Sequence, residues 1–83
     1  MNVAVVKKLV ETHPIGVIQD AIQKFENTLE NPLQVEGQDD GEKLSHLLVA
    51  EIVLQEMAKG LSFHEALRTY SQRVRSMITA PKK

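Results

Sequence analysis

The sequence lacks cysteine and tryptophan, and only 4% of its 83 residues are aromatic. Without cysteine, disulfides and cysteine-ligated zinc or iron–sulfur sites are excluded. No apolar run approaches the ~20 residues that cross a membrane. No secretory signal is recognisable either, because Lys7 and Lys8 lie inside the first apolar stretch instead of before it. These absences predict a small cytoplasmic protein without a membrane partner.

The chain is short, and its length bears on how it is stabilised. A domain of this size buries only about 60% of the surface that its unfolded chain exposes. Small domains usually gain stability from disulfides, a structural metal or a partner chain. The three histidines are scattered, and we predict neither a metal nor any other cofactor. Association with another chain is the remaining way to enlarge the core.

Charge is distributed unevenly although the net charge is only −1. Residues 26–56 contain eight acidic residues and one lysine, a balance of −7. Residues 57–83 contain six basic residues and one glutamate, a balance of +5. Opposite charges on two parts of a small chain can attract a second copy as well as a foreign partner.

Apolar residues recur at spacings of three and four nearly throughout the chain, which predicts an all-α fold. A short first helix is expected to begin after Asn2, a favourable N-cap, and to stop near residues 11–14, because Pro14 disfavours helical geometry in the residue before it. Pro14 suits the first turn of a second helix. That helix is expected to end at Asn31 and Pro32, since proline cannot continue it.

The third predicted helix, over residues 42–59, is the most informative segment. It is expected to be capped by Asp39 or Asp40 and to stop at Gly60. Its apolar residues point in nearly every direction at ~100° per residue, which is typical of a central helix. The chain is too short to surround such a helix completely. We therefore predict a compact bundle of four helices that forms a homodimer or a higher oligomer.

A fourth helix is expected to begin at Phe63, because Ser62 and Glu65 have the spacing of a capping box. Its apolar residues form a narrower stripe that ends near Thr79. Residues 79–83 are expected to be a flexible end. The whole chain, 1–83, is predicted to be a single helical domain.

The predicted interface lies on the third and fourth helices. Glu51 and Gln55 are one turn apart on a side of the third helix that is otherwise apolar. A glutamate buried there requires a partner with the opposite charge. Arg73 or Arg75 of the fourth helix, from this chain or a second subunit, could provide it. A buried acid with a chemical role is one interpretation. An edge-exposed or inter-subunit ion pair is the one that we favour. The predicted interface residues are Leu44, Leu47, Leu48, Glu51, Ile52, Leu54, Gln55, Ala58, Tyr70 and Arg73.

Two further groups of residues invite a metal-site interpretation. The acidic loop 36–42 lacks the alternating oxygen ligands of a calcium loop. We therefore interpret it as a solvated turn that caps the third helix, and whether it binds a cation stays an open question. Glu42 and His46 lie four residues apart on one helical face. Two ligands are too few for zinc, and His46 is interpreted as a histidine packed at a helix boundary.

A basic patch of His64, Arg68 and Arg75 on one flank of the fourth helix suggests nucleic-acid binding as an alternative function. The slightly acidic chain, its few aromatics and the lack of a helix-turn-helix signature favour a solvated or docking face instead. There is no glycine-rich phosphate loop and no nucleophile elbow. We therefore predict no catalytic residue and a protein that is not an enzyme.

Three stretches of the chain resemble a family of short, uncharacterised, all-helical bacterial proteins of the Bacteroidetes type. They are Val-Val-Lys-Lys-Leu-Val-Glu-Thr-His, Gly-Glu-Lys-Leu-Ser-His-Leu-Leu and Ala-Leu-Arg-Thr-Tyr-Ser-Gln-Arg-Val-Arg-Ser. Members are often encoded beside a thioredoxin-like protein and a peroxiredoxin. The resemblance implies an accessory role in thiol redox defence through contact with those proteins. A chain without cysteine cannot itself carry out thiol exchange.

Overall fold

The computed structural model describes the backbone of residues 2–79 and the side chains of residues 2–73. Its elements are α1 (Val3–Thr12), α2 (Ile15–Thr28), α3 (Asp40–Met57) and α4 (Phe63–Thr79). No strand occurs in this part of the chain. The prediction of a four-helix, all-α fold is confirmed. The predicted flexible end lies outside the described residues apart from Thr79, the last residue of α4.

Three of the helices begin where the sequence predicts a cap. The Asn2 and Asp39 side chains each accept a hydrogen bond from an N–H of the following first turn, at 2.9 and 2.8 Å. Ser62 and Glu65 form a reciprocal capping box with bonds of 3.0 and 3.2 Å. Each bond satisfies an N–H that has no partner within its helix, so these starts follow from local chemistry.

The ends of α2 differ from the prediction. Pro14 precedes the helix as its N-cap instead of lying in its first turn, and no side chain caps it. At the other end Leu29 is the C-cap, in the left-handed conformation at a φ of 61°. Asn31 therefore lies beyond the helix, where its side-chain amide accepts from Val35 N–H at 2.9 Å and donates to Val35 C=O at 3.0 Å.

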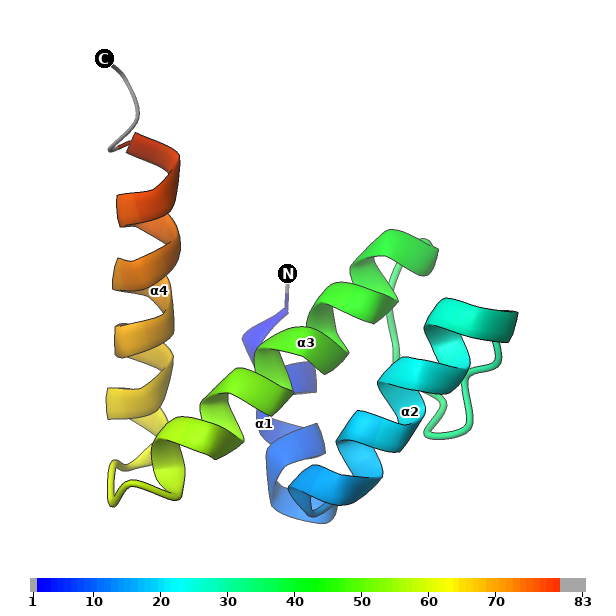
Figure 1. Ribbon diagram of the computed structural model, residues 1–83, viewed down its shortest axis with the longest axis horizontal. Helices are drawn as coiled ribbons and strands as arrows, with labels where there is room; N and C mark the ends of the chain where they lie inside the picture. Colours follow the sequence, from blue (N-terminus) through cyan, green and yellow to red (C-terminus); the bar gives the residue numbers. More distant parts are fainter. Residues whose placement is uncertain (1, 80–83) are drawn as a thin grey trace.

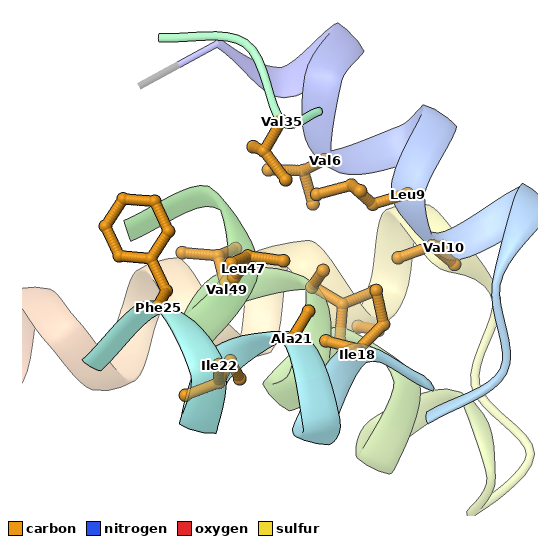
Figure 2. Close-up of a cluster of buried hydrophobic side chains, with 13 residues drawn as sticks. Val6, Leu9, Val10, Ile18, Ala21, Ile22, Phe25, Val35, Leu47 and Val49 are labelled. Carbon is orange, nitrogen blue, oxygen red and sulfur yellow. The ribbon is translucent and has the colours of Figure 1, made fainter. Parts of the chain in front are cut away.

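α3 is the central helix, as predicted, and packs against each of the other three. In Figure 1 it crosses in front of α1, with α2 on one side and α4 on the other. Figure 2 shows the buried side chains of α1, α2, α3 and the loop pointing toward one another. The buried apolar residues are Val6, Leu9, Val10, Ile18, Ala21, Ile22, Phe25, Val35, Leu47, Val49, Ala50, Val53 and Ala66.

Candidate functional site

Among the described residues, one side of α3 carries no buried side chain. At ~100° per residue, Leu44, Leu48 and Gln55 fall within about 40° of one another on the helix surface. Leu48 is 37% exposed, Gln55 is exposed and Leu44 is half-buried. Glu51 and Ile52, both half-buried, lie at the two edges of this strip. We call these five residues the open face of α3.

The structure brings five of the predicted interface residues together on the open face and distributes the rest elsewhere. Leu47 is wholly buried and points into the core cluster, so it offers no surface to a partner (Figure 2). Leu54 and Tyr70 are half-buried against the same core. Ala58 and Arg73 are exposed, one at the end of α3 and the other on α4.

Glu51 has a partner other than the arginine that the sequence suggests. Its Oε2 accepts a hydrogen bond of 3.0 Å from the Gln19 side chain of α2. The carboxylate is only half-buried, so water solvates it and a neutral amide suffices as a partner. The Arg73 guanidinium goes to a different glutamate, and the Arg75 side chain lies outside the described residues.

That glutamate is Glu56, which the sequence reasoning missed. Its side chain is 8% exposed, and its Oε2 lies 3.2 Å from Lys59 Nζ and 3.5 Å from Arg73 Nη2. The Arg73 contact ties α4 to α3. A signal was present in the sequence, since Glu56 lies three residues before Lys59 and three residues after the apolar Val53, on the same side of the helix. Both cations are more than half exposed, so each pair contributes less than about 1 kcal/mol.

His46 is 1% exposed and uses both ring nitrogens. Nε2 accepts from the Asn2 backbone N–H at 3.0 Å, and Nδ1 lies 2.8 Å from the Glu36 carbonyl oxygen. Only the neutral ring with its proton on Nδ1 can make both bonds. His46 therefore joins the start of α1 and the loop to α3, and no lone pair is left for a metal. Glu42, its predicted companion, accepts from Gln38 N–H at 2.7 Å.

A comparison with protein families adds an independent finding. The model of DUF6952, a family of unknown function, matches residues 1–79. The chain belongs to DUF6952. The resemblance to an uncharacterised family is thereby confirmed. No curated protein and no solved structure is significantly similar to the chain.

Two cavities of about 220 and 260 Å³ lie between α1 and the loop of this DUF6952 protein. They share Asn2, Val5 and Glu36 as lining residues. In the cavity of about 220 Å³, the Thr12 hydroxyl donates its proton to the Lys8 carbonyl oxygen at 2.7 Å, so no side-chain base accepts it. Among the described residues, no group of three His, Asp or Glu side chains is placed to hold a metal ion.

The basic patch is only partly described in this DUF6952 protein. His64 and Arg68 are exposed on α4, and the His64 ring meets the Phe63 ring edge-on at 5.8 Å. The Arg75 side chain lies outside the described residues. Within residues 2–79, none of the helices combines the length and the apolar character that a membrane span requires.

Proposed function

We propose that this DUF6952 protein is a non-enzymatic protein-interaction module that self-associates through the open face of α3. Leu48, 37% exposed, lies on this face between the half-buried Leu44 and Ile52, and its exposure carries the proposal. Full burial of a leucine or isoleucine contributes about 1.5–3 kcal/mol relative to exposure. A monomer leaves part of that contribution unused, whereas a second copy on the strip recovers it.

Solution mass as a function of concentration tests this proposal. Sedimentation or light scattering should show the wild-type mass rising to that of a dimer over the micromolar range. Leu48→Lys should remain a monomer, because the ammonium group would have to leave water at the contact. Val17→Lys on α2 is the matched control, since Val17 is 38% exposed and Leu48 37%. Circular dichroism should show unchanged helix content in both variants.

A wild-type protein that stays monomeric at every concentration contradicts the proposal. Equal loss of dimer in Leu48→Lys and Val17→Lys also contradicts the choice of surface, because any added lysine would then suffice. The two outcomes separate the question of self-association from the question of where it occurs.

Nucleic-acid binding is the alternative function, favoured by the exposure of His64 and Arg68 one turn apart on α4. Affinity for a labelled duplex or single strand should fall steeply with salt if phosphates are contacted. The Arg68→Glu, Arg75→Glu double variant should abolish it. Absence of binding at low salt removes this alternative.

A contact role in thiol redox defence is the pathway that the family resemblance implies, and it assumes a bacterial cytoplasmic protein. The cysteine-free chain would act there only by binding. Direct titration with a purified thioredoxin-like protein and a peroxiredoxin encoded beside the gene tests it. If the protein binds neither of them, this pathway is removed, and the proposal of self-association is unaffected.

A further inference from the structure

The cavity of about 220 Å³ is a groove between α1 and the loop that follows α2, and we call it the α1 groove. Its floor is apolar, because Leu9 and Val35 are buried there and Val5 and Leu33 are half-buried. Figure 2 shows Val35 of the loop pointing toward α1. The volume lies below the ~300–1,000 Å³ of pockets for drug-sized molecules, so the groove suits a ligand of about eight non-hydrogen atoms.

The loop side of the α1 groove is held by bonds within the chain. Asn31 brackets Val35 with two hydrogen bonds, of 2.9 and 3.0 Å. Between Leu33 and Val35, Gln34 lines the groove at a φ of 54°, a conformation that a side chain disfavours. Strained residues of this kind cluster at ligand sites, where the surrounding structure holds them in place. A ligand therefore meets a formed groove and does not have to order the loop.

The two ends of the α1 groove differ in charge. Glu36 lies near the start of α1, because its carbonyl oxygen and the Asn2 N–H are bonded to the same histidine ring, at 2.8 and 3.0 Å. Lys8 follows Asn2 by six residues, which is about 9 Å along the helix axis. His13 lines the groove one turn farther on. One end is therefore acidic and the other basic.

The basic end offers hydrogen-bond donors. A lysine ammonium group carries three and a histidine ring at least one. Neither the Lys8 nor the His13 side chain has a hydrogen bond or an ion pair with another of residues 2–73. The negative end of the α1 dipole lies here as well. Its Lys8 and Leu9 carbonyl oxygens already accept from the Thr12 hydroxyl at 2.7 Å and the His13 N–H at 3.1 Å, which reduces their repulsion of an anion.

We propose that the α1 groove binds a small aliphatic carboxylate, with the carboxylate group at Lys8 and His13 and the hydrocarbon chain on the apolar floor. Glu36 repels a carboxylate at the opposite end and so sets the direction of the ligand. Two donor groups converge at the basic end and one carboxylate lies at the other, so an acid finds more partners than an amine does. The groove is separate from the open face of α3, and the proposal does not depend on self-association.

Titration with hexanoate, followed by two-dimensional NMR of the backbone amides, tests this site. The signals of Val5, Leu9 and Val35 should shift with a dissociation constant of about 1 mM, whereas Leu48 on the open face of α3 should not shift. Hexanamide and hexylamine, the neutral and cationic analogues, should bind at least about fivefold more weakly. Butanoate should bind roughly tenfold more weakly, because it has fewer methylene groups to bury.

Replacing the cation tests the direction of the ligand. Lys8→Met keeps the length of the side chain and removes its charge, so it should weaken hexanoate binding about fivefold and leave hexanamide binding unchanged. Lys7→Met is the matched control, since Lys7 is exposed on α1 and does not line the groove. It should change neither affinity.

Four results would each overturn the inference. They are the absence of any shift at about 20 mM hexanoate, shifts centred on Leu48 instead of the α1 groove, hexanamide or hexylamine binding as tightly as hexanoate, and an equal loss of affinity in Lys8→Met and Lys7→Met. None of these results bears on the mass of the protein in solution, so the proposed self-association is tested separately.

Discussion

The covered side and the open side of α3 carry similar residues in different surroundings. Leu47 is wholly buried, whereas Leu48, the next residue, is 37% exposed. On the covered side even the polar side chains of His46 and Glu56 are buried and have partners within the chain. The core of one chain therefore accounts for the apolar character of the covered side. It does not account for the exposed Leu48 of the open side, which is the residue that the proposed self-association would cover.

Truncating the two neighbouring leucines gives the largest expected contrast. Leu47→Ala should lower the free energy of unfolding by about 3 kcal/mol, because it leaves a cavity in the core. Leu48→Ala should lower it by less than about 1 kcal/mol when both are measured at a concentration where the protein is monomeric. Denaturant unfolding followed by circular dichroism provides both values. Equal losses would show that the two sides of α3 do not differ as described.

Removal of the buried imidazole tests the polar part of the covered side. His46→Ala should lower the free energy of unfolding by about 2 kcal/mol, since the Asn2 N–H and the Glu36 carbonyl lose their partner. His64→Ala, at an exposed position of α4, is the control and should change stability by less than about 0.5 kcal/mol. Similar values for the two histidines would show that the interior bonds contribute nothing.

An exposed leucine outside the open face sharpens the comparison. Leu29 is 63% exposed and holds a φ of 61°, which a side chain disfavours. Leu29→Gly should raise the free energy of unfolding by about 1 kcal/mol and leave the dimer mass unchanged. Gly60→Ala, at a φ of 103°, should have the opposite effect on thermal stability. If Leu29→Gly weakens the self-association that we propose, Leu29 belongs to the contact surface as well.

The smallest effect is expected where α4 meets the covered side. Arg73→Ala should lower the free energy of unfolding by about 0.5 kcal/mol, because the arginine is 54% exposed and its bond to Glu56 is 3.5 Å long. Added salt should remove most of the difference between wild type and variant. A loss that is large and insensitive to salt would mean that α4 depends on this ion pair for its position.

The sequence by itself determined the four helices and most of their starts. Asn2, Asp39, Ser62 and Glu65 cap their helices as predicted, because capping depends on a few neighbouring residues. The end of α2 was predicted less well. The side chain of Asn31 is used to hold Val35, and that bond depends on where the loop runs.

Only the tertiary structure decided which side of α3 is covered. A helix that is apolar nearly all round has no preferred face in its sequence, so Leu47 and Leu48 are equivalent until α1, α2 and α4 are in place. For the same reason the sequence identified a glutamate of α3 as the partner of Arg73 but chose Glu51 instead of Glu56. Local chemistry specifies where a helix begins, whereas burial depends on contacts between residues distant in the chain.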